Sequence, residues 1–475
     1  MGMMAALGRW MANALSDSLM RRLLTEPYPE SVFSMLPILN KVQMINFIET
    51  GMRAHKGKPI SRPLGSPVIL SEWHKILLNP VHLFRMPTPD QVQIDTKTVI
   101  GPRAAKPLET KIPILISGMS YGGALSLEMK VALARGAAMA GTATNTGEAP
   151  LVPQERQAAK FLIGQYNRGG WLNNDDDLSK LDAIEIQLGQ GAQASSPMRT
   201  PSWMTGPNYR QLYGLKDGED AVIHSRLPGV ESAEDFVRLV RRLRETHGVP
   251  VGLKIAATHH LERELAIALR AGIDYFVVDG AEAGTHGGPP ILQDDVGLPT
   301  LHALARTVRY LEDQGVKNQI SVIAAGGLVS PGHFLKALAL GADAVYIGTL
   351  ALLAALHTQI NKAAPTEPAV QVALYTGRFT EDLDQEAAAQ DLYRYLQAAV
   401  KEMTITVYSL GKGSIKEVNR EDLCTTDPLL ARVCRIDYAG FPPGDAQGLA
   451  AGNGVPGQGR RIPAPAGAGA PSQPR

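Results

Sequence analysis

The chain has 475 residues, and its 47 basic and 46 acidic side chains leave a formal net charge of +1. That balance excludes a global electrostatic attraction to nucleic acid. With 44% hydrophobic and 20% charged residues, there is apolar material for a large core, so disorder of the whole chain is excluded too. Two cysteines, Cys424 and Cys434, are too few for a four-thiolate iron–sulfur cluster, and we expect a reduced, cytoplasmic protein without a metal site.

The N-terminal region, residues 1 to about 110, mixes apolar helical patterns with proline-rich joints. Leu and Met recur at helical spacing over the first 24 residues, and Arg9 interrupts the apolar run, which favours an amphipathic helix over a secretory signal. No stretch of about 18 consecutive apolar residues occurs, so no membrane span is expected. We predict a helical and extended N-terminal arm over 1–110.

From 111 to about 357, short runs rich in Val, Ile and Ala alternate with helical segments, which is typical of βα units. The candidate strands are 112–117, 142–145, 161–165, 183–188, 251–256, 275–280, 321–326 and 344–348. Helical periodicity marks 125–140, 233–246, 261–272, 300–314 and 333–341 between them. Because eight parallel strands close a (β/α)8 barrel, we predict an α/β protein with a TIM barrel over 111–357.

Beyond the last predicted strand, the chain changes character twice. Residues 358–440 are helical and polar and predict a C-terminal helical appendage. Residues 441–475 are rich in Pro, Gly and Ala with almost nothing to bury, which predicts a disordered tail.

Two glycine-rich turns end the last two predicted strands. Gly326 and Gly327 end one, and Gly348 and Thr349 end the next. Glycines let the backbone approach an anion closely, and the N–H groups of a following helix favour negative charge. In a barrel this pair of turns indicates a binding site for the phosphate of a flavin or a sugar phosphate.

The ends of the first two strands carry small and polar residues. Ser117, Met119 and Ser120 follow the first strand, where backbone and small side chains could cover a flavin face. Asn145 and Glu148 follow the second, and a carboxylate at the barrel mouth could act as a general base or hold an ammonium group.

Lys254 lies within an otherwise apolar strand, where a cation would be buried unless something anionic meets it. A lysine there could stabilise the negative N1–C2 carbonyl edge of a reduced flavin. The polar turn after the sixth strand carries Glu282, Gly284 and Thr285 and indicates ligand contact. The histidines near these strands lack metal-ligand spacing.

Seven segments of the chain together resemble, in order and spacing, the FMN-binding synthase domain of glutamate synthase. They are SGMSYGG, NTGE, the LGQGA segment with Gln190, VGLKIA, DGAEAGTHGGPP, AAGGL and YIGT. The resemblance covers about 40–440 and is nearest to stand-alone glutamate-synthase-like proteins. It implies a (β/α)8 barrel, FMN as cofactor, and reduction of an imine formed from a 2-oxo acid and ammonia. We expect Asn145, Gln190, Gly284 and Thr285 to bind this cofactor together with the residues of the first strand end, Lys254 and the two glycine-rich turns.

The chain departs from that family in two places. Gln187 and Gln193 stand where the family segment has lysines, the first of which reaches the oxo acid, so the substrate is left open. The stretch 351–373, where the family has three cysteines, has none, so no 3Fe–4S cluster is expected. Without an expected glutaminase domain, ammonia would be free or supplied externally, and electrons would come from a separate ferredoxin or NAD(P)H-linked subunit. A homo-oligomer is a further option.

The leading hypothesis is therefore a glutamate-synthase-like oxidoreductase with Lys254, Glu148 and Glu282 as catalytic residues. A second keeps the barrel and FMN but takes another amino acid, oxo acid or amine, as in N-methylglutamate synthesis, which Gln187 and Gln193 favour. A third is a flavoprotein subunit without catalysis.

Overall fold

The computed structural model describes residues 2–27 and 40–444. The chain divides into two compact units, Met1–Pro63 with Gly287–Pro290, and Leu64–His286 with Ile291–Arg475. The predicted division into four parts stays a prediction, and residues 445–475 of the expected disordered tail lie outside the described residues.

Among its described residues, the smaller unit includes the helices α1 (Gly2–Thr25) and α3 (Met44–Lys56). The expected N-terminal helix is present as α1, and the apolar side chains described on it, among them Trp10 and Leu15, are exposed. In the described ranges, 2–27 and 40–444, no helix has both the length and the apolar character needed to cross a membrane.

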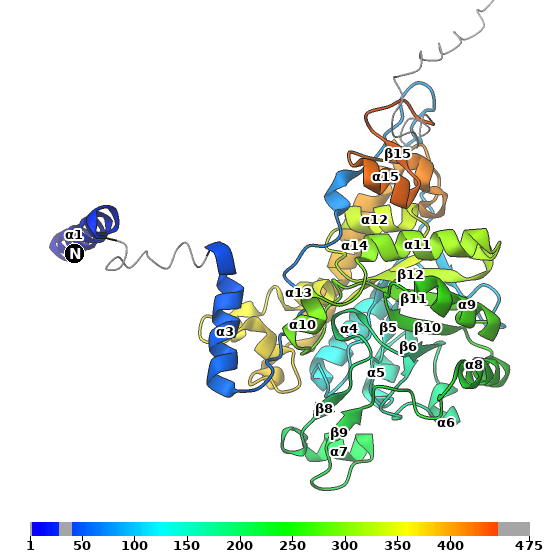
Figure 1. Cartoon of the computed structure of the whole chain (residues 1–475), viewed down its shortest axis with the longest axis horizontal. Helices are drawn as coiled ribbons and strands as arrows, with labels where there is room; N and C mark the ends of the chain where they lie inside the picture. Colours follow the sequence, from blue (N-terminus) through cyan, green and yellow to red (C-terminus); the bar gives the residue numbers. More distant parts are fainter. Residues whose placement is uncertain (1, 28–39, 445–475) are drawn as a thin grey trace, which may run out of the picture. The chain divides into compact units, whose positions relative to one another are not determined.

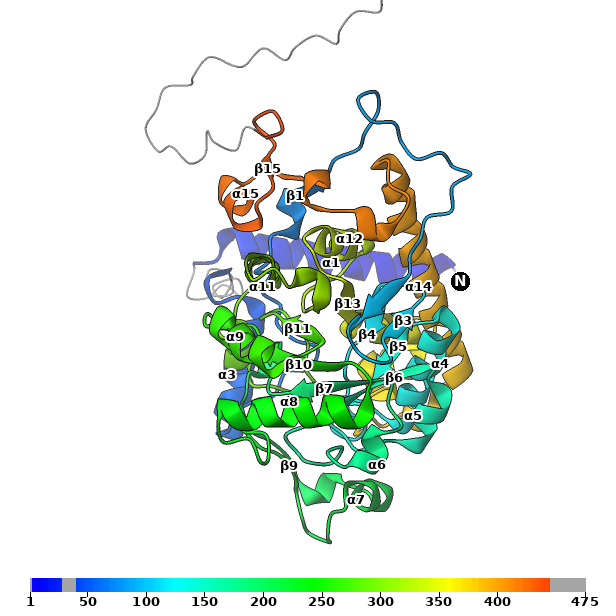
Figure 2. The same ribbon diagram turned by 90° about the vertical axis from the view of Figure 1, so that its right-hand side faces the viewer.

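The larger unit is built on an eight-stranded parallel barrel (Figures 1 and 2). Its strands are β4 (Ile114–Ile116), β5 (Ala143–Asn145), β6 (Phe161–Tyr166), β7 (Ala183–Gln187), β10 (Val251–Ala256), β11 (Tyr275–Asp279), β12 (Ser321–Ala325) and β13 (Ala344–Ile347). All eight predicted strands and the TIM-barrel fold class are thereby confirmed. The hydrogen-bonded order is β4-β13-β12-β11-β10-β7-β6-β5, and Thr142 Oγ1 donates to Ile114 O at 2.7 Å between the two ends of that order.

The strands read as continuous apolar runs because both of their faces are buried. One face packs against the surrounding helices, and the other fills the barrel with a second cluster that includes Leu115, Tyr275 and Ile323. The surrounding helices are α4 (Leu127–Ala140), α5 (Pro153–Ala158), α6 (Asp175–Leu178), α8 (Ala233–His247), α9 (Leu261–Ala271), α10 (Pro290–Asp294), α11 (Thr300–Asp313), α12 (Pro331–Ala339) and α13 (Thr349–Leu356). Figure 2 shows α8, α9 and α11 outside the ring of strands.

Several elements lie outside the βα repeat. The insertion between β7 and β10 contains β8 (Met198–Thr200), α7 (Pro207–Tyr213) and β9 (Ala221–Ile223), and it projects from one end of the barrel (Figure 1). The strands β2 (Thr98–Ile100) and β3 (Leu108–Thr110) form an antiparallel pair ahead of the barrel. The C-terminal part contains α14 (Gln385–Ser409), β14 (Leu423–Thr425), α15 (Pro428–Cys434) and β15 (Asp437–Tyr438), and β14 pairs with β1 (Ile76–Leu78).

Candidate active site

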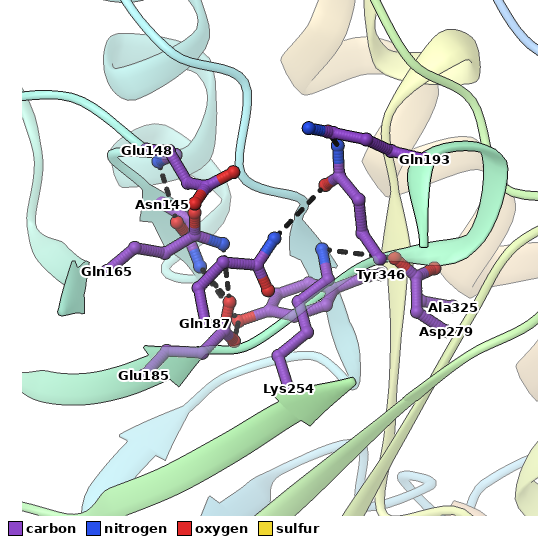
Figure 3. Close-up of polar contacts among 12 residues, drawn as sticks. Asn145, Glu148, Gln165, Glu185, Gln187, Gln193, Lys254, Asp279, Ala325 and Tyr346 are labelled. Carbon is purple, nitrogen blue, oxygen red and sulfur yellow. Dashed lines mark hydrogen bonds and ion pairs between the residues drawn. The ribbon is translucent and has the colours of Figure 1, made fainter. Parts of the chain in front are cut away.

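Polar side chains gather inside the barrel near the carboxyl ends of its strands (Figure 3). The strand register sets their positions, because Gln165 on β6 is paired with Glu185 on β7, and Gln187, two residues further, is paired with Lys254 on β10. Residues two apart on a strand point to the same face. Glu185 and Gln187 therefore form successive layers of one polar interior.

Glu185 is the centre of the deeper layer. Its carboxylate is fully buried and accepts hydrogen bonds from Asn145 Nδ2 at 3.1 Å and Gln165 Nε2 at 2.8 Å on one oxygen, and from the Tyr346 hydroxyl at 2.8 Å on the other. Burial, followed by the Glu185 charge, raises the pKa of Tyr346 well above its ordinary value, so that hydroxyl stays protonated and donates. A buried carboxylate needs such donors, and here three side chains supply them.

Lys254 lies in the upper layer, 1% exposed, with its Nζ 3.2 Å from Asp279 Oδ2. Burial by itself lowers the pKa of this ammonium, but the charges of Asp279 and Glu185 outweigh that effect and raise the pKa above the ordinary lysine value. The ion-pair partner of Lys254 is thus a carboxylate at the end of the next strand. Lys254 is a fixed, buried cation at the barrel mouth.

Glu148 is held by a second buried cation. Arg168 Nε and Nη2 each lie 3.1 Å from one oxygen of the Glu148 carboxylate, a bidentate pair in which Arg168 has no exposed surface. Arg168 Nη1 also donates to Ser196 O at 3.2 Å, which ties the loop after β6 to the insertion that follows β7. The predicted carboxylate is present at the mouth, and its orientation is set by an arginine that the sequence analysis did not select.

The end of β5 at Asn145, and with it the loop that carries Glu148, rests on a buried lysine of α4. Lys130 Nζ donates to Asn145 O at 2.8 Å and lies 2.7 Å from Glu155 Oε1, with both charged groups at most 2% exposed. Burial raises the pKa of the Glu155 carboxyl, while Lys130 acts against that rise. The ammonium therefore binds the main chain at the point where β5 ends and the loop begins.

Glu282 is engaged in a different way. One carboxylate oxygen accepts from Thr300 N at 2.8 Å and from Thr300 Oγ1 at 2.9 Å, at the start of α11, and the other accepts from Ser71 N. The residue before α11 is Pro299, which offers no side-chain cap, so Glu282 supplies the negative charge that the helix N-terminus favours. Its contacts are those of a helix cap.

The two glycine-rich turns, at Gly326–Gly327 and at Gly348, differ in their backbone conformation and in the space around it. Gly326 and Gly327 have φ values of 99° and 65°, in the left-handed region that side chains avoid, and a Cβ at Gly327 would come within 2.8 Å of Glu282 Cβ. Gly348 stands at the N-terminus of α13, where no side chain caps the helix, and a Cβ there would meet nothing closer than Ser117 at 3.8 Å. Open space before an uncapped helix N-terminus fits a phosphate group.

The remaining predicted cofactor residues surround these turns. A Cβ on Gly284 would lie 2.9 Å from Thr349 Oγ1, so the loop after β11 touches the turn after β13. Thr285 O accepts from Leu64 N at 2.9 Å. Ser117 N donates to Ile347 O at 2.9 Å, and the loop that contains Met119 and Ser120 follows directly.

Three glutamines form a chain of amides at the end of β7. Gln187 Nε2 lies 3.4 Å from Gln190 Oε1, and Gln190 Nε2 lies 2.8 Å from Gln193 Oε1. Gln187 and Gln193 are buried, and within residues 2–27 and 40–444 neither Gln187 Oε1 nor Gln193 Nε2 has a hydrogen-bond partner. Gln187 and Gln193, the two positions where the resembling family segment has lysines, thus face the same polar interior.

Five further residues of the site were not predicted from the sequence: Glu185, Gln165, Tyr346, Arg168 and Lys130. Three of them carry the signal that selected Lys254, since Glu185, Gln165 and Tyr346 are polar residues inside apolar strands. Arg168 follows β6 in a loop, and Lys130 lies in a helix, where a charged residue is ordinarily solvated. Only tertiary contacts reveal those two.

Residues 80–413 match the family model described as the conserved region in glutamate synthase. The matched residues make up 70% of the chain. The chain belongs to the glutamate synthase family. With the family comes the class of activity, that of an oxidoreductase acting on CH–NH2 donors.

Relatives support the assignment. A glutamate synthase large subunit-like protein of Rhizobium meliloti is 32% identical over 365 residues, 73% of this chain and 82% of that protein. An archaeal-type glutamate synthase [NADPH] of Thermotoga maritima is 32% identical over 334 residues, 70% of this chain and 65% of that protein. The chain thus spans slightly less than two thirds of the archaeal-type relative.

Solved structures agree on the fold. A mutant flavocytochrome b2 with benzoylformate aligns with a TM-score of 0.51 at 17% identity and covers 84% of this chain and 88% of that one. At this identity the likeness concerns the barrel fold alone.

Proposed function

We propose that the protein is an FMN-dependent, glutamate-synthase-like enzyme that reductively aminates a 2-oxo acid with free or externally supplied ammonia. The observation that carries the proposal is Lys254, a buried ammonium paired with Asp279 at the carboxyl end of the barrel. A structural lysine has little reason to occupy the inside of a barrel strand, whereas an anionic ring edge at the mouth gives it a role.

The residues present fit FMN. The turns at Gly326, Gly327 and Gly348 with Thr349 would hold the phosphate, and the loop from Ser117 to Ser120 would lie along the ring. Bound in reduced form, FMN would supply the two electrons and the hydrogen that convert a C=N bond into a C–N bond. Lys254 would stay charged beside the ring, since the pKa of its ammonium is raised.

The substrate half of the site would be arranged by Glu148 and Arg168. The oxo acid and ammonia condense with loss of water, and reduction of the resulting imine carbon also consumes one proton. A carboxylate has lone pairs beyond the two that Arg168 engages, so Glu148 would hold the ammonium or relay one of its protons to the imine. Glu282, which caps α11, would position the loop after β11 instead of touching substrate.

Electrons would reach FMN from a separate component, a ferredoxin or an NAD(P)H-linked subunit. The archaeal-type relative bears NADPH in its name, which favours NADPH as the ultimate donor. The stretch 351–373 has no cysteine, so a cluster bound there is not part of the proposed route.

A second candidate keeps the fold and FMN but changes the substrate to another amino acid or amine, for example by using methylamine in place of ammonia. The uncharged side chains of Gln187 and Gln193 in the polar interior favour it. A flavoprotein subunit without catalysis is the third, and the ordered contacts of Lys254 and Glu148 argue against it.

The test begins with the cofactor. Mass analysis of the ligand released by heat from the purified full-length chain should give FMN, and the reduced protein should then be screened anaerobically against 2-oxo acids with ammonia and with methylamine. Reoxidation of the flavin with formation of an amino acid supports the proposal, and methylamine dependence selects the second candidate. Recovery of FAD, or of no flavin after reconstitution with excess FMN, would contradict the proposed function.

A further inference from the structure

The glutamine chain of Gln187, Gln190 and Gln193 has two ends that face the polar interior without a partner. Gln187 is the last residue of β7, and Gln193 lies in the short turn Gly191–Gln193 that follows. The next residue, Ala194, has φ 52° and ψ −138°, a conformation that an alanine adopts only where its surroundings impose it. The turn is therefore held in a defined shape.

The chemistry of the two ends is fixed by the chain itself. Gln187 uses its N–H group toward Gln190, and Gln190 uses its N–H group toward Gln193, which leaves a carbonyl oxygen at one end and an NH2 group at the other. Turning all three amides around exchanges the ends but still leaves one acceptor and one donor. The chain therefore calls for a ligand with a donor and an acceptor.

The buried cations of the site already have carboxylate partners. Lys254 is paired with Asp279, and Arg168 binds Glu148 through two nitrogens. An anionic group brought to the glutamines would lose its hydration and gain no counter-charge from them, and one of its oxygens would face the carbonyl end. The surroundings thus disfavour a carboxylate at this position.

We propose that Gln187, Gln190 and Gln193 bind an uncharged primary carboxamide at the far end of the substrate. Its NH2 group donates to the carbonyl end of the chain, and its carbonyl oxygen accepts from the NH2 end. The assignment rests on the proposed function for the reacting end of the substrate and narrows the substrate class to acids with an amide side chain.

Other groups satisfy the glutamines less well. A carboxylate supplies only acceptors, and an ammonium supplies only donors. A hydroxyl has both, but on one oxygen atom, and the whole Gln190 amide separates the two ends. The pyrimidine edge of the flavin also carries N–H and C=O groups, and the experiment below distinguishes it from the substrate.

The experiment compares two unreactive acids of the same shape, glutaramate and glutarate, which differ in one end being a carboxamide or a carboxylate. Their dissociation constants are measured by calorimetry on the FMN-loaded full-length chain. We expect glutaramate to bind at least about tenfold more tightly, because a site built for an amide leaves groups unpaired against the wrong ligand. Equal affinities, tighter glutarate binding, or binding of neither acid would overturn the proposal.

Two variants locate the effect. Gln187→Glu turns both ends of the chain into acceptors, so glutaramate binding should weaken at least about tenfold and 5-aminopentanoate, which ends in an ammonium, should gain. Gln193→Lys adds a cation, so glutarate binding should strengthen and the preference should narrow or reverse. The matched control is Gln211→Glu, an exposed glutamine on α7, which should leave both constants unchanged.

FMN affinity of the same variants separates the two possible ligands. If both variants release FMN at least about tenfold more readily while the ratio of the two acids stays as in the wild type, the glutamines bind the flavin and the proposal is wrong. If glutaramate binds selectively but no 2-oxo acid is aminated, amide recognition stands and the proposed function falls.

Discussion

Glu185 and Gln187 are two residues apart on β7, and their surroundings differ in one respect. The Glu185 carboxylate has three side-chain donors, whereas the glutamine chain that begins at Gln187 has a free acceptor at one end and a free donor at the other. Disturbing a buried network whose hydrogen bonds are all made destabilises the fold. A buried network with unpaired donors and acceptors can form its missing hydrogen bonds with a ligand. The deeper layer is thus a scaffold, and the upper layer is where binding is to be sought.

The largest expected effect tests that contrast in folding. Glu185→Leu removes the acceptor of Asn145, Gln165 and Tyr346 at once, so the free energy of unfolding should fall by roughly 3–5 kcal/mol. Gln187→Leu gives up only the 3.4 Å contact with Gln190 and should cost less than about 1 kcal/mol. Urea unfolding of the two variants and the wild type measures both, and equal losses would contradict the distinction between the layers.

The next effect concerns the support of the loop after β5. Lys130→Met removes the ammonium that binds Asn145 O and leaves Glu155 buried without a cation, so stability should fall by about 3 kcal/mol and kcat/KM by about 100-fold. In the double variant Lys130→Met/Glu155→Gln the unpaired charge is gone, and stability should largely return.

The kcat/KM values of the single and the double variant show whether Lys130 positions the loop after β5 or only stabilises the fold. Because neither replacement restores the hydrogen bond to Asn145 O, the double variant should keep the low kcat/KM of the single variant. Recovery of kcat/KM together with stability would show that Lys130 serves only to neutralise Glu155.

The barrel could be predicted from the sequence because each strand is buried on both faces. Such strands appear in the sequence as short apolar runs bounded by polar turns. The insertion with β8, α7 and β9 has no such signal, since its strands are three residues long and half-exposed. Within the site, Lys254 was found as a cation in an apolar strand, and the same reasoning reaches Glu185. That Arg168 meets Glu148, and Lys130 the main chain at Asn145, depends on contacts between separate elements, which spacing along the chain does not encode.

A smaller effect sharpens the role assigned to Lys254. If its ammonium lies beside the flavin edge, Lys254→Met should lower the two-electron potential of bound FMN by at least about 30 mV, which corresponds to roughly 1.4 kcal/mol. Asp279→Asn removes the charge that offsets Lys254 and should shift the potential the other way. Redox titration against a dye of known potential measures both, and unchanged midpoints would remove Lys254 from the cofactor site.

The smallest effect is a pH dependence that appears only in alkali. A folded-state pKa raised above the unfolded value of about 10.4 means that the Lys254 contribution is fully present below pH 10.4 and is lost as the pH rises through the folded pKa. In that window the unfolded chain has released a proton that the folded chain keeps, so the free energy of unfolding falls with pH. Lys254→Arg carries a cation that does not titrate there. Urea unfolding at pH 9 to 11 should therefore show a shallower decline for Lys254→Arg than for the wild type, and parallel declines would mean that the Asp279 and Glu185 carboxylates do not hold the proton on Lys254.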